Sequence, residues 1–288
     1  METVWWLLKQ LYTKDLLYKG YTIQPYSPKA GTGLSSHEVN QPGAYRDVSD
    51  TTVVAQFQMK KSPKNASETW KFLSSLAYPN SEINTDEIAG ATCGGALHWA
   101  EFEEQKPQPK VYFLAWTTTP WTLPSNTALT VGPKIDYVLV KTFNQYTFEP
   151  IYVILGKPLI TKQFGKKFTE GKDEDFANFT SESKVIPYKI LKEFKGTDLV
   201  GIEYEQLLPY ARPYQNPENA FRVISGNFVT TEDGTGIVHT APTFGADDAK
   251  VAKEASPEVP PMLVLDKNGN PVPLVDLQGK FLSIVNDE

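Results

Sequence analysis

The sequence predicts a mainly β fold of the α+β class, in which peripheral helices surround a β-barrel or β-sandwich core. Three observations predict this: the chain has many short segments with strand patterns, few segments with helical spacing, and no regular alternation of the two. A doubly wound parallel sheet requires such an alternation. With 288 residues, 40% of them hydrophobic and 22% charged, the chain is long enough to bury a sizeable core.

Three segments have the pattern of a helix. Residues 1–12 place apolar side chains on one face, and Gly20 follows as a stop. Residues 66–77 have the length of a short helix. Residues 247–255 begin with two acids, which the helix macrodipole favours in a first turn.

Strand patterns occupy several of the remaining segments. Residues 53–59 alternate between apolar and polar side chains, as a half-buried strand does. Residues 111–116 form a short apolar run that enters a tract of threonines. Further strands are expected at 93–102, 137–140 and 151–155, the last two joined by a turn near 144–145.

Turn residues organise the rest of the chain. Residues 221–230 and 236–239 are expected to pair as two strands around a turn at 233–234. Residues 266–270 predict a second turn between strands. Residues 21–50 are rich in Pro, Gly and Ser and are expected to be irregular with short extended pieces. Residues 164–183 are polar and charged and are expected to form a loop.

Composition excludes several classes of protein. A net charge of −6 argues against non-specific nucleic-acid binding as the main task. Lysines do cluster in 157–172 and 184–195, although solvated surface lysines explain either cluster alone. The single cysteine, Cys93, excludes an internal disulfide and a multi-cysteine metal site. No apolar run reaches the roughly 18 residues of a membrane span, and the N-terminal segment is a poor signal peptide, so a cytoplasmic location without membrane partners is expected.

Several common catalytic motifs are missing from the sequence. It has no GxxxxGK[ST] loop and no strand-linked GxGxxG, so a phosphate-cradling loop is not supported. It has no HExxH and no paired histidines at helical spacing, so no metal site is expected. It has no GxSxG elbow, which argues against a serine esterase.

A first segment with chemical character runs from Trp116 to Asn126. Thr117, Thr118 and Thr119 stand at the end of an expected strand, and two prolines follow. Prolines fix φ and remove donors, so the loop is stiff and presents hydroxyl and N–H groups in a fixed arrangement. By composition alone, threonines selected for strand propensity are the simpler interpretation.

A second such segment runs over residues 234–248. Its glycines permit a tight turn and close backbone approach. His239 ends the expected strand, and Asp248 follows at a helix start, so one pocket can receive both side chains. Capping by Asp247 and Asp248, with His239 as a hydrogen-bonded and partly buried residue, is the simpler interpretation of a lone pair.

Together the two segments resemble the editing (connective polypeptide 1) domain of isoleucyl-tRNA synthetases, in the class I aminoacyl-tRNA synthetase family. Residues 116–129 look like its threonine-rich motif and residues 234–248 like its second motif. The resemblance covers nearly the whole chain and is weakest at 60–109 and 163–183. Segments 4–6, 20–27, 45–48 and 196–199 also fit.

Two details refine the resemblance. Valyl and leucyl editing domains usually carry Arg-Pro and an acid after the first two threonines, whereas this chain has Thr119-Pro120-Trp121, which favours the isoleucyl branch. Many bacterial members have Gly-His in the second motif where this chain has Thr243 and Phe244, as in the eukaryote-like branch. The resemblance therefore assigns no role to these two residues.

The resemblance implies a closed or nearly closed β-barrel core of the valyl, isoleucyl and leucyl editing type. It implies a connecting segment from the synthetase body at 1–48 and an editing domain at 49–288, truncated at its C-terminal end. The HIGH and KMSKS motifs of amino-acid activation are absent, and residues 59–62 match the latter only in part. No cofactor is therefore expected for this fragment, and ATP and Mg²⁺ are expected only for the full-length enzyme.

The function implied is hydrolysis of valine from mischarged isoleucine tRNA, with the tRNA 3′ end and the rest of the synthetase chain as partners. By resemblance, Asp248 binds the α-ammonium group, and Thr117, Thr118 and Thr119 contact the substrate and orient water. His239 narrows the pocket against isoleucine, with a base role ranked second. Asn126 fixes the loop or binds the terminal ribose, and Trp116 packs on the terminal adenosine or in the core.

Three other interpretations remain open at this point. The chain could be a valyl-type editing domain that clears threonine. It could be a non-catalytic module that binds tRNA acceptor ends, which the lysine clusters suit. It could also be an unrelated β-barrel protein with a chance motif match.

Overall fold

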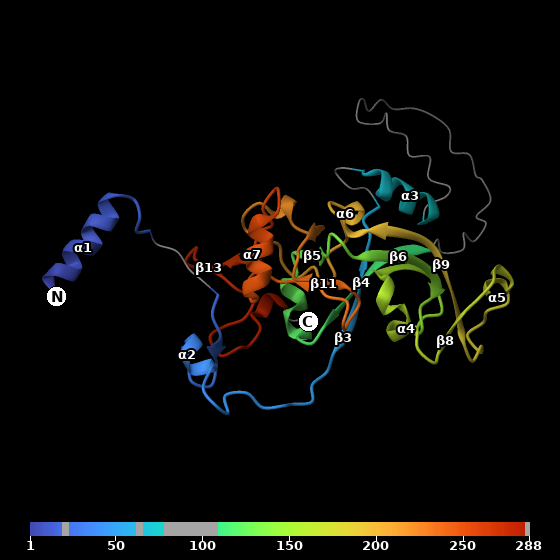
Figure 1. The fold of residues 1–288 in the computed structure, drawn as a ribbon, viewed down its shortest axis with the longest axis horizontal. Coiled ribbons are helices and arrows are strands. Elements are labelled where there is room, and N and C mark those ends of the chain that lie inside the picture. The colour runs from blue at the N-terminus through green and yellow to red at the C-terminus, as the bar shows by residue number, and fades with distance from the viewer. Residues whose placement is uncertain (19–22, 62–65, 78–108, 286–288) are drawn as a thin grey trace, which may run out of the picture.

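The structure is a computed structural model that describes residues 1–18, 23–61, 66–77 and 109–285 (Figure 1). Its centre is a nine-stranded mixed sheet with the strand order β10-β5-β11-β4-β7-β6-β9-β8, and β3 also pairs with β4. The strands are β3 (Val53–Gln58), β4 (Lys110–Thr117), β5 (Ala128–Val131), β6 (Asp136–Phe143), β7 (Pro150–Gly156), β8 (Phe168–Glu170), β9 (Ile186–Lys195), β10 (Arg222–Ser225) and β11 (Ile237–Thr240).

The expected closed or nearly closed β-barrel is wrong. The strand path is open, with β10 at one end and β8 at the other, and the fold is a mixed α/β sheet with helices packed around it. In the described ranges, β3 and β10 are linked only through isolated bridges, Met59 with Tyr204 and Glu203 with Arg222, which do not build a strand. Parallel pairing of β4 with β7 and of β5 with β10 also departs from an all-antiparallel barrel.

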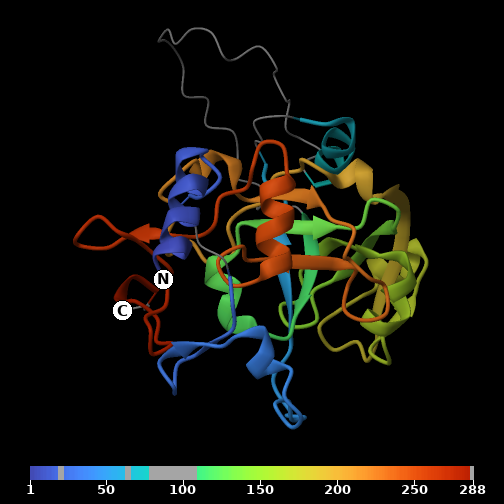
Figure 2. The same ribbon diagram turned by 60° about the vertical axis from the view of Figure 1, so that its left-hand side comes forward.

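Most helices of the described ranges lie around this sheet, and the first of them stands apart from it (Figures 1 and 2). The helices are α1 (Glu2–Thr13), α2 (Ser36–Val39), α3 (Glu68–Ala77), α4 (Ile160–Gln163), α5 (Asp173–Ala177), α6 (Gly196–Leu199) and α7 (Ala246–Glu254). Short 3₁₀ turns occur at η1 (Pro120–Ser125), η2 (Lys157–Leu159), η3 (Pro217–Asn219) and η4 (Ser283–Val285). Two small hairpins, β1 (Tyr26–Ser27) with β2 (Thr32–Gly33) and β12 (Val264–Leu265) with β13 (Pro271–Val272), complete the fold.

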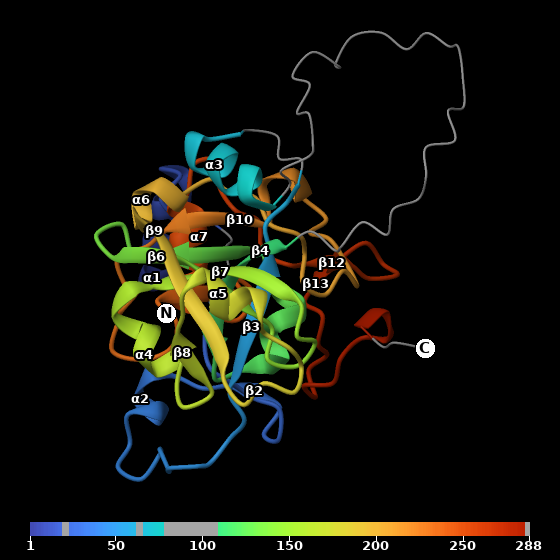
Figure 3. The ribbon, with the colours of Figure 1, turned by 90° about the vertical axis from the view of Figure 1, so that its right-hand side faces the viewer.

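The main core lies on the face of the sheet that α3 covers. Phe57, Phe113, Leu139 and Ile154 are fully buried there, because alternate side chains of each strand point to the same face. Figure 3 shows β6, β7 and β9 side by side in this part of the sheet. Helix α7 packs separately, through a small cluster that joins it to β5 and β10.

Helix α1 confirms the helix expected at 1–12, but none of its side chains is buried. It stands apart from the sheet in Figure 1. Trp5, Trp6 and Tyr12 are exposed on it. None of the helices in the described ranges combines the length and apolarity that crossing a membrane requires.

Most of the expected elements are confirmed. These are the helices at 66–77 and 247–255, the strands at 53–59, 111–116, 137–140 and 151–155, and the turns at Asn144 and at 266–270. The Asn144 side chain accepts hydrogen bonds from the backbone N–H groups of Tyr146 and Thr147, which closes that turn. The strand expected at 93–102 lies outside the described residues.

Two expectations about β structure are wrong. Strands β10 and β11 do not pair with each other, because both pair with β5, which lies between them. The segment 164–183, expected to be a loop, contains β8 and α5, and the ten-residue strand β9 follows it. Polar and basic side chains obscure the strand pattern in this region, because several side chains of β9 are exposed.

Candidate active site

The ends of β4 and β11 and the start of α7 meet around one cavity. Val238 of β11 pairs in parallel with Trp116 of β4, so the carboxyl ends of these two strands lie at the same edge. The cavity has a volume of about 370 Å³, within the range of small-molecule sites. It is lined by Trp116, Thr117, Thr118, Thr119, Trp121, Thr122, Val238, His239, Ala241, Phe244, Gly245 and Asp248. The structure therefore brings the two sequence motifs together.

The threonine tract forms a folded-back loop at the end of β4. Thr117 is 7% exposed, and its Oγ1 accepts a hydrogen bond of 3.1 Å from the Thr119 backbone N–H. The carbonyl of Thr119 accepts from the Thr122 N–H at 3.0 Å, which starts η1. Thr118 and Thr119 remain exposed. The loop thus keeps two threonine side chains available at the cavity.

His239 is 6% exposed, and both of its ring nitrogens are engaged. Its Nδ1 lies 2.8 Å from the Asn126 Nδ2, and its Nε2 lies 2.9 Å from the Thr122 Oγ1. The amide nitrogen of Asn126 also donates to the Ala128 carbonyl at 2.8 Å, which fixes the orientation of the amide. Because an amide N–H only donates, Nδ1 must be the acceptor, and the ring proton is on Nε2.

The hydrogen bonds around His239 continue in both directions. The Tyr204 hydroxyl donates to the Asn126 Oδ1 at 2.6 Å. On the other side, Thr122 accepts from the ring N–H and donates its own hydroxyl proton to the Thr119 carbonyl at 2.8 Å. Each donor in this series of hydrogen bonds thus faces an acceptor. Through Thr122, the imidazole is connected to the Thr119 carbonyl in the threonine loop.

Burial lowers the pKa of His239 to about 4, because the charged ring would lose its hydration. A second proton on Nδ1 would also face the N–H of Asn126. His239 is accordingly neutral at pH 7. This environment makes it a poor acceptor for a proton from water.

Asp248 lies in the first turn of α7, and its carboxylate is turned toward the cavity. Its Oδ2 accepts a hydrogen bond of 2.8 Å from the Ala241 backbone N–H. Burial raises the pKa of Asp248, and the hydrogen bond from Ala241 opposes that shift. Gly245 leaves the room for this side chain, since a Cβ there would lie 2.8 Å from the Asp248 Cγ.

Trp116 forms one wall of the cavity. Gly234, at φ +77°, lies against its ring, and a Cβ at that position would lie 2.9 Å from the Trp116 Cε3. The Trp116 backbone N–H donates to the Thr235 Oγ1 at 3.2 Å. Gly234 of the second motif thus leaves room for the Trp116 ring of the first motif.

Asn126 is 2% exposed and does not line the cavity. It lies behind His239, with its amide bonded to the ring, to Ala128 and to Tyr204. The Asn126 side chain thus contacts the histidine that lines the cavity and is not itself part of the lining.

Sequence reasoning missed an aromatic pair that joins the two motifs. Trp121 is 48% exposed and meets Phe244 edge to face, with ring centroids 4.8 Å apart. Both rings line the cavity. Thr243 has a different place, because its hydroxyl donates to the Met262 carbonyl. Where many bacterial members have Gly-His, this chain thus has Thr243, which is bonded to Met262, and Phe244, whose ring lines the cavity.

The remaining missed lining residues are Thr122, Val238, Ala241 and Gly245. Each is a neighbour of a motif residue, but its small side chain carries no distinctive chemistry in the sequence. The polarity of Thr122 was the only available indication, because its hydroxyl follows the threonine tract at helical spacing.

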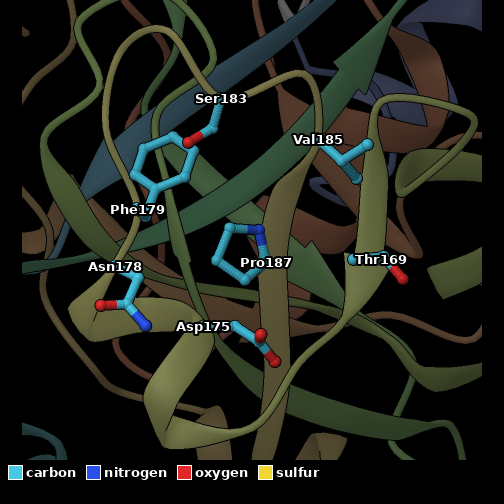
Figure 4. Close-up of a pocket in the computed structure, with 7 residues that line it drawn as sticks. All are labelled: Thr169, Asp175, Asn178, Phe179, Ser183, Val185 and Pro187. Carbon is cyan, nitrogen blue, oxygen red and sulfur yellow. The ribbon is translucent and has the colours of Figure 1, made fainter.

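A second cavity, of about 180 Å³, lies away from these motifs between β8, α5 and β9 (Figure 4). Figure 4 shows its lining side chains, which are Thr169, Asp175, Asn178, Phe179, Ser183, Val185 and Pro187. The Asp175 carboxylate accepts from the Lys172 backbone N–H at 2.7 Å, which caps α5. The acid of this cavity therefore has a structural role.

Four of the nine lysines in the two clusters form ion pairs with acids. Four ion pairs involve them: Lys157 with Glu193, Lys162 with Asp233, Lys189 with Asp173 and Lys195 with Asp136. Lys192 lies over the Phe72 ring, 3.8 Å from its centroid. Across the described ranges, no three acidic, histidine or cysteine side chains are grouped as a metal site.

Comparison with solved structures finds leucyl editing domains at low identity. GlLeuRS-CP1 is 16% identical with a TM-score of 0.43, and the match covers 71% of this chain and 58% of that one. The editing domain of the P. falciparum cytosolic leucyl-tRNA synthetase is 15% identical with a TM-score of 0.41, covering 70% and 65%.

Comparison of sequences gives a much closer similarity. The isoleucine–tRNA ligase of Bacteroides fragilis is 55% identical over 284 residues, which are 99% of this chain and 21% of that protein. Those of Cytophaga hutchinsonii and Clostridium tetani are 53% and 39% identical, over 100% and 99% of this chain and 21% and 19% of theirs. The chain spans about a fifth of the length of these relatives. The family described as tRNA synthetases class I (I, L, M and V) matches residues 1–233, and this chain belongs to that family.

Proposed function

We propose that this chain is a hydrolytic editing domain of an isoleucyl-tRNA synthetase and removes valine from mischarged isoleucine tRNA. One observation carries the proposal: three consecutive threonines and the His239–Asp248 pair, which are distant in sequence, line one cavity. The similarity to isoleucine–tRNA ligases over 99% of the chain supports the choice of tRNA.

Asp248 is the group that binds the α-ammonium of the valyl ester. Its Oδ2 is held by Ala241, which orients the carboxylate toward the cavity. A charge-assisted hydrogen bond to an ammonium group is about twice as strong as a neutral one. The positive charge also offsets the burial that raises the pKa of Asp248. A substrate with a blocked amino group would lose this interaction.

The threonines position the attacking water. The water oxygen adds to the ester carbonyl carbon, and the bond from that carbon to the ribose oxygen then breaks. The ribose leaves as a free hydroxyl and takes up one proton, so the products are valine and uncharged tRNA. Threonine hydroxyls are too weakly acidic to act as bases at pH 7, so Thr118 and Thr119 contribute orientation and hydrogen bonds to developing charge.

His239 shapes the cavity as a neutral ring. With Nδ1 and Nε2 both engaged and a pKa of about 4, it is better suited to packing against the amino-acid side chain than to accepting a proton. A single methylene is worth about 1–3 kcal/mol in a hydrophobic pocket, roughly 10–200-fold, a general range for which isoleucyl-tRNA synthetase is itself the standard example. The cavity that His239 lines, which rejects the larger side chain, supplies the remaining discrimination.

The terminal adenosine is the partner of the aromatic side chains. Trp121 and Phe244 offer ring faces and edges at the cavity, and base stacking on such rings is worth about 1–3 kcal/mol. Trp116 is seated on Gly234 and borders the same cavity. The rest of the synthetase chain is the natural partner for the exposed apolar side chains of α1.

The test is a deacylation assay with the 288-residue chain on valyl-tRNA(Ile), isoleucyl-tRNA(Ile) and threonyl-tRNA(Val). We expect hydrolysis of the first and little of the second. Asp248→Asn should reduce hydrolysis, whereas Asp247→Asn should not. Both residues lie in the first turn of α7, but only Asp248 lines the cavity.

The other outcomes identify the alternatives. Faster hydrolysis of threonyl-tRNA(Val) would indicate a valyl-type editing domain. Binding of the acceptor end without hydrolysis would indicate a non-catalytic module. Equal hydrolysis of valyl and isoleucyl esters would contradict the proposed discrimination.

A further inference from the structure

Tyr204 and Asn126 stand behind the cavity and touch no substrate-accessible surface. Tyr204 is 1% exposed, and its backbone forms the isolated bridge with Met59. Its hydroxyl has one partner among the described residues, the Asn126 Oδ1 at 2.6 Å. Most side-chain hydrogen bonds in proteins go to the backbone or to water, but this one joins two buried side chains.

We propose that Tyr204 and Asn126 are positioning residues that lock His239 in its Nε2–H tautomer and thereby hold the threonine loop in place. The tautomer is fixed because the Asn126 amide nitrogen can only donate and its oxygen can only accept. The Ala128 carbonyl requires the amide nitrogen, and the Tyr204 hydroxyl donates to the amide oxygen. The amide therefore offers His239 a donor and never an acceptor.

The consequence reaches the cavity through Thr122. With the proton on Nε2, the ring donates to the Thr122 Oγ1, and that hydroxyl is free to donate to the Thr119 carbonyl. With the proton on Nδ1, the ring would face the amide N–H, and Thr122 would have to give its proton to Nε2 instead of to Thr119. The other tautomer would therefore remove the hydroxyl bond to the Thr119 carbonyl and leave that carbonyl with the Thr122 backbone N–H alone.

This inference rests on the proposed function only for its effect on hydrolysis, because the tautomer is a property of the free protein. Two-bond ¹H–¹⁵N correlations of the ¹⁵N-labelled chain distinguish the two neutral tautomers and the imidazolium. The sequence has three histidines, and a His239→Gln variant assigns the signal. A failure of the editing proposal would leave this measurement intact.

The wild type should show the Nε2–H pattern at pH 7. Asn126→Asp has the same shape but presents an acceptor to Nδ1, so it should move the signal to the Nδ1–H or imidazolium pattern. Tyr204→Phe should make a second tautomer detectable, because the amide oxygen loses its donor. The matched control is Tyr137→Phe, which removes another buried tyrosine hydroxyl, bonded to Gly132 and Gly236. It should retain the wild-type pattern.

An Nδ1–H pattern in the wild type would overturn the proposal whether or not the variants fold. A wild-type pattern in either folded variant would overturn it as well. With valyl-tRNA(Ile), Tyr204→Phe should lower kcat by about tenfold, the value of one buried hydrogen bond, without a matching rise in KM. An equal loss in Tyr137→Phe would assign that effect to general destabilisation and contradict the positioning role.

Discussion

Gly245→Ala is a steric test of the role of Asp248 that leaves every ionisable group in the sequence unchanged. Gly245 has φ −103° and ψ 129°, which alanine adopts without strain. A Cβ at this position would lie 2.8 Å from both the Cγ and the Oδ2 of Asp248. Since real Cβ contacts are not this short, the carboxylate must rotate away from its bond to the Ala241 N–H.

The size of the effect follows from the interaction that is lost. A hydrogen bond to a charged group contributes about 1.5–3 kcal/mol, which corresponds to about 10- to 150-fold in rate. We therefore expect kcat/KM for valyl-tRNA(Ile) to fall by that factor in Gly245→Ala. The loss of glycine at the start of α7 should cost about 1 kcal/mol of stability, which is too little to unfold a domain.

The assay is steady-state deacylation, accompanied by thermal unfolding of each variant. Gly165→Ala is the matched control, because a Cβ at Gly165 would meet nothing within 4 Å. It should retain full hydrolysis. Full hydrolysis in a folded Gly245→Ala would refute the assignment of Asp248 as the ammonium-binding group.

Three further predictions follow from the same cavity. Burial lowers the folded-state pKa of His239 from 6.5 to about 4, so the unfolded chain binds more protons than the folded chain between these pH values. About 3 kcal/mol of stability should therefore be lost as pH falls from 6.5 to 4. Denaturant unfolding of the wild type and of His239→Gln across that window checks this, and parallel profiles would contradict it. Thr122→Val should leave the Nε2–H of His239 without an acceptor and cost about 1–3 kcal/mol in the free energy of unfolding, measured in urea; a neutral result would contradict the hydrogen bond between Thr122 and His239. Trp121→Ala should raise KM for valyl-tRNA(Ile) by about 5- to 150-fold through the loss of base stacking, with kcat little changed; an unchanged KM would remove the ring from the adenosine site.

The sequence allowed the local elements of the site to be predicted because their chemistry is concentrated in two short motifs. Threonines that end a strand and an acid that begins a helix follow from propensity and capping alone, and both are confirmed as structure. Their meeting at one cavity could be expected only from the resemblance. The physical cause is the parallel pairing of Val238 with Trp116, a contact between residues more than a hundred positions apart.

The environment of each side chain could not be predicted in the same way. The choice between sterics and base chemistry for His239 depends on Asn126 and Thr122, which meet the two ring nitrogens only in the folded chain. The depth at which Asn126 is buried decides that it supports the histidine and does not reach the cavity. Proximity to the threonine motif along the chain carries no such information.

The open sheet is the clearest difference from expectation. The count of short strands favours a barrel or a sandwich, and the resemblance implies a closed or nearly closed barrel, but closure requires hydrogen-bonded strands all the way round. Around Tyr204 the chain makes single bridges where a strand would be needed. Whether residues extend a ladder there depends on long-range register, which the alternation of a short segment does not reveal.

A structure of the chain with a non-hydrolysable analogue of the valylated terminal adenosine tests the proposed editing site most directly. We predict that the analogue occupies the cavity of about 370 Å³, with its ammonium group bonded to Asp248 and its ester carbonyl beside Thr118 and Thr119. Binding of the analogue at another surface, or in this cavity with the amino group turned away from Asp248, would contradict the proposed mechanism.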